Sequence, residues 1–245
     1  MQSAVLGARL AVVEGNLRGI RGLTVDGFGA LLDGGPARLP SVLSQHVPNQ
    51  RHEPTQVADL WRNRLRKHLR SEPFITFREV YRRTFQDVLG SLGLPDSVEE
   101  CVEATLDEYR KAKAHPEVPR VLKSLEQEVP FAVVSNMDTA ALLAALLANR
   151  LTPTFVVTSD EEQKYKPDPA PFRRAARYLG LPLDHIVHVG DSYADDVLGA
   201  SSVGMHSLLI HRDIGRPPLP PGVVVETVRN LEEVRKYIER SWEDG

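Results

Sequence analysis

Three aspartates fall close together late in the chain, at Asp191, Asp195 and Asp196. They follow the apolar run 186–189 and Gly190, a pattern typical of a buried strand that ends where the acids begin. Carboxylates at this spacing repel one another unless a cation or a positive side chain lies among them. Because oxygen ligands suit a hard divalent cation, Mg²⁺ is the simplest ion to expect among these acids.

A fourth aspartate, Asp26, closes a short apolar run at residues 22–25 and precedes the turn Gly27-Phe28-Gly29. Glycines on both sides of Phe28 allow backbone N–H groups to face a bound anion. An aspartate followed by glycine is also common in plain turns. The case for a functional role of Asp26 therefore depends on polar residues elsewhere in the chain.

Further polar groups follow other apolar runs. Ser135 closes the run 131–135, Asn136 comes next, and Lys166 opens a Lys-Pro-Asp-Pro stretch before a helical segment. In a parallel sheet the C-terminal strand ends share one edge, so these residues are expected to converge with Asp26. A carboxylate can attack an anionic phosphorus centre only if their repulsion is cancelled, and a lysine with a divalent ion can do that.

The apolar patterns that must position these groups alternate between strands and helices. Strands are predicted at residues 22–26, 131–135, 154–158, 186–189, 206–210 and 223–225. Helices are predicted at residues 118–128, 138–149, 169–179, 195–203 and 231–242. This order predicts an α/β fold whose core is a Rossmann-like, mainly parallel sheet with helices on both faces.

The region between the first two strands has a different character. It lacks strand patterns and carries predicted helices at residues 55–69, 77–92 and 96–113, which indicates an inserted α-helical cap. The predicted divisions are a core domain of residues 20–36 and 116–235, a helical cap domain of residues 37–115, and an N-terminal extension of residues 1–19.

The cap contains a locally basic stretch, residues 62–70, for which a solvated helix face is the favoured interpretation because no aromatic residues interleave with the basic ones. The sequence leaves open whether four further side chains of the insertion point inward or outward: Arg51, Trp61, Arg62 and Arg78.

Composition limits the function classes. The 245 residues carry 30 basic and 33 acidic side chains and a net charge of −3, which gives no electrostatic reason to expect nucleic acid or an anionic membrane as partner. A single cysteine, Cys101, excludes an internal disulfide, and no apolar run is long enough to span a bilayer. We expect a cytoplasmic monomer or homodimer that binds a small anionic metabolite.

Taken in order, these stretches resemble the four motifs of the haloacid dehalogenase (HAD) superfamily of hydrolases. The fourth match, Gly190-Asp191-Ser192 with Asp196, is highly specific, as is the Lys-Pro-Asp-Pro stretch that begins at Lys166. The helical insertion after the first motif is similar to the smaller, C1-type cap of that superfamily. The resemblance covers most of the chain and implies a hydrolase of the phosphatase type.

The resemblance implies a role for each matching residue. Asp26 would be the nucleophile that forms an aspartyl-phosphate, Ser135 would hold a transferring phosphoryl oxygen, and Lys166 would neutralise charge between nucleophile and substrate. Gly27 and Asn136 would also contact the substrate.

The resemblance implies a metal site as well. Asp191 would bind Mg²⁺ together with the Asp26 carboxylate and the backbone carbonyl of Phe28, with Asp196 as a further or water-mediated support.

The first motif departs from the phosphatase pattern at two positions. Phe28 stands where phosphatases of this superfamily carry a second aspartate, which protonates the leaving oxygen and then activates water, and Ala30 stands where a threonine is usual. Loss of a positioned acid/base costs on the order of 10² to 10⁴ in rate. Efficient hydrolysis of simple phosphomonoesters is therefore not expected.

Three functions are compatible with this site. The favoured one is a Mg²⁺-dependent phosphohydrolase suited to leaving groups that need little protonation, such as acyl phosphates. The second is a 2-haloacid dehalogenase, since Phe28 occupies the tyrosine position of that branch and halide leaves without a proton; Asp191 opposes it, because an unpaired carboxylate repels the ionised nucleophile. The third is a non-catalytic binding protein of the HAD fold, which Phe28 and Ala30 favour and Asp26, Lys166 and Asp191 oppose.

Overall fold

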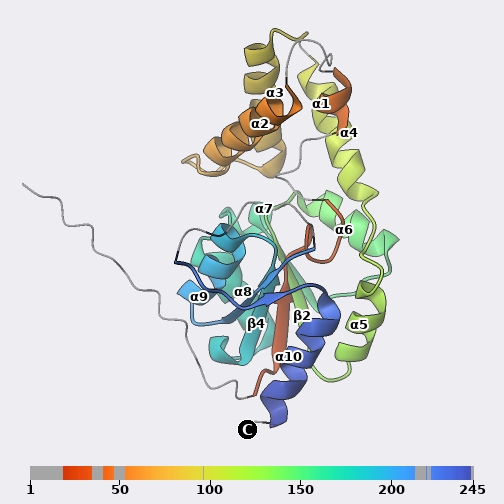
Figure 1. Ribbon diagram of the computed structural model, residues 1–245, viewed down its shortest axis with the longest axis vertical. Helices are drawn as coiled ribbons and strands as arrows, with labels where there is room; N and C mark the ends of the chain where they lie inside the picture. The colour runs from red at the N-terminus through yellow and green to blue at the C-terminus, as the bar shows by residue number, and fades with distance from the viewer. Residues whose placement is uncertain are drawn as a thin grey trace, which may run out of the picture.

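The computed structural model describes residues 19–34, 41–46, 53–95, 97–212, 219 and 222–243. Its core is a parallel six-stranded sheet in the order β3-β2-β1-β4-β5-β6 (Figure 1). The strands are β1 Gly22–Val25, β2 Phe131–Ser135, β3 Phe155–Thr158, β4 Ile186–Gly190, β5 His206–Ile210 and β6 Thr227–Val228. The predicted Rossmann-like α/β fold is confirmed.

The prediction of a strand at residues 223–225 is wrong. The sixth strand is Thr227–Val228, which pairs with the end of β5. Val224 is 74% exposed, so the apolar run at 223–225 does not enter the core. Apolar β-branched residues raise strand propensity but do not by themselves show burial.

Helices cover both faces of the sheet. The core helices are α5 Val118–Leu125, α6 Thr139–Ala148, α7 Ser159–Glu162, α8 Pro169–Leu179, α9 Leu198–Ser202 and α10 Leu231–Glu243. The alternation of side chains in β2 shows the two layers: Phe131 and Val133 pack in the cluster that includes α5, α6 and α10, whereas Ala132 and Val134 pack on α8. Asp138 and Asp168 cap α6 and α8, since Asp138 accepts from the Ala141 N–H and Asp168 from the Ala170 N–H.

Helices α1 Ser41–His46, α2 Pro54–Leu69, α3 Phe77–Leu92 and α4 Val98–Arg110 follow β1 and lie together at the top of Figure 1, beyond the sheet. They enclose an aromatic cluster in which Tyr81 lies 5.3 Å from Trp61 and 4.5 Å from Phe77, ring centroid to ring centroid. The boundary predicted at residues 36/37 and the extension up to residue 18 lie outside the described residues, and the division into two domains stays a prediction. In the described part of the chain, no helix has the length and apolar character needed to cross a bilayer.

Candidate active site

Four neighbouring strands supply the predicted site residues. Asp26 follows β1, Ser135 ends β2, Asp191 follows β4, and Lys166 lies in the loop that leads from β3 and α7 to α8. Because β3, β2, β1 and β4 are parallel neighbours, their C-terminal ends bring residues from distant parts of the chain to one edge of the sheet. The convergence predicted from the sequence is therefore present in the structure.

Lys166 is the centre of this cluster. Its ammonium group, buried with the rest of the side chain, lies 2.7 Å from Asp26 Oδ1, 2.6 Å from Asp196 Oδ1 and 2.9 Å from the Val134 carbonyl. These three acceptors use all three N–H donors of the ammonium group. One buried cation is therefore shared by two carboxylates.

Asp196 is held on every side by hydrogen bonds. Besides Lys166, its Oδ1 lies 3.3 Å from His188 Nε2, and its Oδ2 accepts from the Ser192 N–H at 2.9 Å. His188 Nδ1 lies 2.9 Å from the Thr24 hydroxyl, and burial lowers the pKa of His188, so the neutral ring can accept from Thr24 and donate to Asp196. His188 is thus a buried histidine with both ring nitrogens in hydrogen bonds. Asp196 thus positions Lys166, and its predicted part in metal binding stays a prediction.

Asn136 anchors the backbone of the same lysine. Its Oδ1 accepts from the Lys166 N–H at 2.7 Å, and its Nδ2 donates to the Lys166 carbonyl at 3.2 Å. Ser135 is buried against the turn after Asp26, where a Cβ added at Gly27 would meet its hydroxyl at 3.1 Å. The structure brings these residues together as predicted, while the predicted contacts of Ser135, Asn136 and Gly27 with substrate stay predictions.

The three carboxylates Asp26, Asp191 and Asp196 each offer an oxygen, and these oxygens all lie within 4.8 Å of one another. Gly29 shapes this cluster, because a Cβ at that position would come within 2.2 Å of Asp191 Oδ2. The donor set consists only of oxygen atoms and one side of it is open, since Asp191 is only partly buried. These features fit a hard divalent cation.

Gly29→Ala is expected to weaken Mg²⁺ binding at least tenfold, because the new methyl group displaces the Asp191 carboxylate, and one lost charged ligand contact is worth about 1.4 kcal/mol or more. The matched control is Gly34→Ala. Gly29 has φ +97° and Gly34 has φ +98°, so the two alanines meet a similar backbone cost, yet a Cβ at Gly34 would contact nothing within 4 Å. Isothermal titration with Mg²⁺ checks this, and equal losses in both variants would contradict the assignment of Asp191.

The electrostatics of the cluster depend on burial and on Lys166. Burial, together with the Asp196 and Asp191 carboxylates, raises the pKa of Asp26 to about 8 against the pull of Lys166. Although burial acts in the same direction on Asp196, Lys166 and His188 hold the pKa of that carboxyl well below its usual range. In the metal-free protein Asp196 is therefore the ionised partner of Lys166. A divalent cation beside Asp26 would favour its ionised, nucleophilic form.

Phe28 does not take part in this polar network. Its side chain is 1% exposed and packs edge-on against Tyr109 of α4, with ring centroids 4.9 Å apart. The two backbone bonds of the turn use the Gly27 carbonyl and the Gly29 N–H, not the Phe28 carbonyl. Ala30 is buried, and its carbonyl accepts from Arg212 Nε at 2.9 Å. The predicted metal contact of the Phe28 carbonyl stays a prediction.

A cleft of about 440 Å³ opens between α2 and the loops that carry Lys166 and Asp195. The α2–α3 connection and the first residue of α3 contact the core: the Phe77 N–H donates to Asp160 Oδ1 at 2.9 Å, and the Tyr165 hydroxyl donates to the Ile75 carbonyl at 2.9 Å. Burial raises the pKa of Asp160 to about 6. The candidate site is thus covered by the inserted helices.

The cleft adds to the interpretation of the basic stretch. Arg62, Arg66 and Arg70 line the cleft, while Arg66 and Arg70 are also exposed, as expected for a solvated helix face. Of the other cap residues that the sequence left open, Trp61 is fully buried, Arg78 is exposed and paired with Glu103, and Arg51 lies outside the described residues. The four-residue spacing of these arginines in the sequence already indicates that they share one face of the helix.

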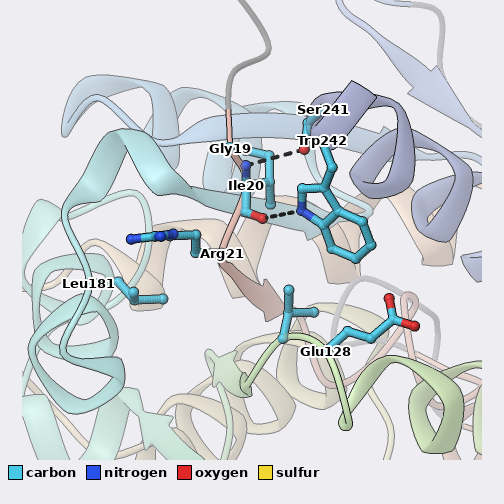
Figure 2. A pocket seen from close by; sticks show the side chains of 8 residues that line it. Gly19, Ile20, Arg21, Glu128, Leu181, Ser241 and Trp242 are labelled. Atoms are coloured by element: carbon cyan, nitrogen blue, oxygen red, sulfur yellow. Dashed lines mark hydrogen bonds between the residues drawn. The ribbon is translucent and has the colours of Figure 1, made fainter. Parts of the chain in front are cut away.

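Another hollow, of about 570 Å³, lies at the opposite edge of the sheet (Figure 2). There Trp242 Nε1 donates to the Ile20 carbonyl at 2.8 Å, and the Gly19 N–H donates to the Ser241 carbonyl at 3.0 Å. These contacts precede β1, whereas Asp26 follows it. Since parallel α/β sheets carry their chemistry at the C-terminal strand ends, the cleft beside Lys166 is the candidate active site.

A parallel α/β core with an aspartate after the first strand, paired with a buried lysine and set beside further carboxylates, defines a hydrolase of the HAD type. Comparison with known proteins agrees. A sequence model of haloacid dehalogenase-like hydrolases matches residues 41–204, and the chain belongs to that family.

Individual relatives span part of the chain. It is 31% identical over 149 residues to haloacid dehalogenase-like hydrolase domain-containing protein 3 of Xenopus laevis, which covers 58% of each protein. It is 32% identical over 127 residues to a phosphoglycolate phosphatase of Neisseria meningitidis, covering 46% of this chain and 52% of the relative. The chain thus matches little more than half the length of these relatives. Among solved structures, L-2-haloacid dehalogenase from Xanthobacter autotrophicus shares the fold with a TM-score of 0.72 at 19% identity, covering 90% of this chain and 98% of the other.

Proposed function

We propose that the protein is a Mg²⁺-dependent phosphohydrolase that acts on a small phosphorylated metabolite through an aspartyl-phosphate on Asp26. The observation that carries the proposal is the 2.7 Å contact between Lys166 Nζ and Asp26 Oδ1, beside the carboxylate of Asp191. This arrangement supports attack on an anionic centre, because a fixed positive charge lies between nucleophile and substrate. The similarity to a phosphatase over part of the chain adds support.

In the first step, an Asp26 carboxylate oxygen attacks phosphorus, and the bond from phosphorus to the leaving oxygen breaks with its electron pair going to that oxygen. Lys166 stabilises the charge on the phosphoryl oxygens, and Ser135 donates a hydrogen bond to one of them. Asp196 and Asn136 keep Lys166 in place through the bonds described above. Mg²⁺, held by Asp26 and Asp191, would supply Lewis-acid stabilisation of the transferring phosphoryl group.

Phe28 determines which leaving groups can depart. Its ring offers no proton, so the leaving oxygen must be stable as an anion, as the carboxylate of an acyl phosphate is. Water attack on the aspartyl-phosphate also proceeds without a carboxylate at position 28 to activate it. We therefore expect acyl phosphates to be preferred and the phosphorylated protein to accumulate during turnover.

The test compares acetyl phosphate with p-nitrophenyl phosphate, with and without Mg²⁺, for the native protein and Asp26→Asn. We expect Mg²⁺-dependent phosphate release, faster from acetyl phosphate, and a loss of at least about 10³-fold in Asp26→Asn because the nucleophile is gone. Intact-mass analysis of acid-quenched native protein should show one added phosphoryl group. Phosphate release that Asp26→Asn leaves unchanged would contradict the proposal.

A second candidate function is a 2-haloacid dehalogenase. The specific observation in its favour is the aromatic side chain of Phe28 beside the nucleophile, since halide leaves without a proton. Asp191 remains the argument against it. Metal-independent halide release from L-2-chloropropionate would favour this function, and the absence of both products with retained Mg²⁺ binding would favour a binding role. The cytoplasmic location and the monomeric or homodimeric state stay predictions.

A further inference from the structure

The cleft over the site carries three cations on the cap in addition to Lys166. Arg62, Arg66 and Arg70 follow one another at four-residue spacing on α2 and its C-terminal cap, so they share one face of the helix. At 1.5 Å per residue the row extends about 12 Å. A row of this length exceeds what a single phosphoryl group can contact.

The arginines of the row differ from the other basic residues of α2 in their partners. On the side toward α3, Asp87 Oδ2 lies 4.0 Å from Arg64 Nε and 3.9 Å from Lys67 Nζ. On the cleft side, Arg62 pairs with Asp59, but no described carboxylate lies within ion-pair distance of Arg66 or Arg70. The helix dipole favours basic residues in the last turn on every face of the helix. It therefore does not explain why the arginines without an ion-pair partner lie on the cleft side.

The acidic residues of the cleft wall neutralise the row only in part. Glu72 pairs with Lys164 at 3.6 Å, and Asp168 caps α8. Asp195 accepts from the Ser192 hydroxyl at 3.0 Å and also feels the charge of Arg70. Five cationic side chains line the cleft against these three acids. The surplus positive charge lies on the cap side and faces the loops of the site.

Apolar side chains line the cleft as well. Leu65, Leu69 and Phe74 are among them, and an uncharged carbon spacer can pack against them. The cleft therefore combines Lys166, apolar side chains and a second group of cations on α2.

We propose that Arg62, Arg66 and Arg70 form a subsite for a second anionic group of the substrate. The substrate class is a phosphorylated metabolite with a carboxylate or a further phosphate, separated from the reacting phosphoryl group by an uncharged carbon spacer. This inference rests on the proposed function only in placing the reacting phosphoryl group at Asp26 and Lys166.

Three probes built on a four-carbon chain test the subsite: n-butyl phosphate, 4-(phosphonooxy)butanoate and butane-1,4-diol bisphosphate. Their alkoxide leaving groups need a proton, so they serve as ligands in calorimetry with Mg²⁺ present. The native protein should bind the two doubly anionic probes at least about tenfold more tightly than n-butyl phosphate, since each charge-assisted contact in an open cleft contributes about threefold to fivefold. The two probes also separate a carboxylate from a phosphate as the preferred second group.

The matched variants are R66Q/R70Q, on the cleft side, and R64Q/K67Q, on the side toward α3; each removes two positive charges. R66Q/R70Q should abolish the preference for the doubly anionic probes, while R64Q/K67Q should retain it. Equal affinity of the native protein for all three probes, no measurable binding of any of them, or an equal loss in both variants would overturn the proposal. Binding does not require turnover. The calorimetric result can therefore be interpreted even if the hydrolysis assay shows that Asp26 is not a nucleophile.

Discussion

Lys166→Met should lower the free energy of unfolding by about 3 to 5 kcal/mol at pH 8, because breaking a buried ion pair leaves an uncompensated charge. Here the loss involves two carboxylates, Asp26 and Asp196, which both bond to the ammonium group. Methionine fills most of the volume of the lysine stem, so the effect comes from charge rather than from a cavity. Urea unfolding with EDTA present measures it.

The loss should be smaller at pH 5 than at pH 8. In the native protein Lys166 and His188 hold the pKa of Asp196 low, so the stability from this carboxylate is present above about pH 4 and is lost as the pH falls further. Without Lys166, burial raises the pKa of Asp196 above its unfolded value, and the pKa of Asp26, already about 8 in the native protein, rises further. The folded variant then binds more protons than the unfolded chain, and its stability falls as the pH rises from about 4 toward 8.

Lys164→Met is the matched control. Lys164 lies two residues away, is about half exposed and pairs with Glu72 at 3.6 Å, so its loss should change stability by no more than about 0.5 kcal/mol at either pH. Hydrolysis of acetyl phosphate should fall by about 10² to 10³ in Lys166→Met, in line with removal of one preorganised charged donor. A Lys166 variant as stable as the Lys164 control at pH 8 would show that Lys166 does not balance the two acids.

Much of the fold follows from the sequence because local patterns and burial agree. Val25, Val133, Val157 and Val189 lie in short apolar runs, and the helices between these runs permit only a parallel sheet with crossovers. The strand predicted at 223–225 is wrong because an apolar run does not by itself show whether its residues are buried, and Val224 is exposed.

The candidate site was predictable as a set of residues but not as a network. Parallel strand ends explain why Asp26, Ser135 and Asp191 meet, and the motif spacing pointed to Lys166. Which carboxylates pair with the lysine depends on side-chain directions between distant parts of the chain, so the sequence did not show that Asp26 and Asp196 share Lys166. The direction of the arginine row depends on how α2 sits over the sheet, which helical periodicity does not determine.

Phe28→Asp should raise the rate of phenyl phosphate hydrolysis by about 10²-fold or more, because it restores a group that can protonate the leaving oxygen. Acetyl phosphate hydrolysis should change less, since its leaving carboxylate needs no proton. The substitution also removes the ring that contacts Tyr109 and buries a carboxylate, so a loss of about 3 to 5 kcal/mol in unfolding free energy is expected. Thermal unfolding of each variant establishes the temperature at which the rates are compared.

Phe28→Asn is the control that separates the two effects. It removes the same ring and leaves nearly the same volume as aspartate, so both variants lose the contact with Tyr109, but the amide cannot exchange a proton with the leaving group. A faster rate in Phe28→Asp than in Phe28→Asn therefore reports acid/base catalysis alone. Equal rates on phenyl phosphate would mean that an acid at position 28 does not reach the leaving oxygen, and the preference for acyl phosphates would then need another cause. A dehalogenase or a binding protein would gain nothing from either substitution, so the same pair of variants also separates the proposed function from its alternatives.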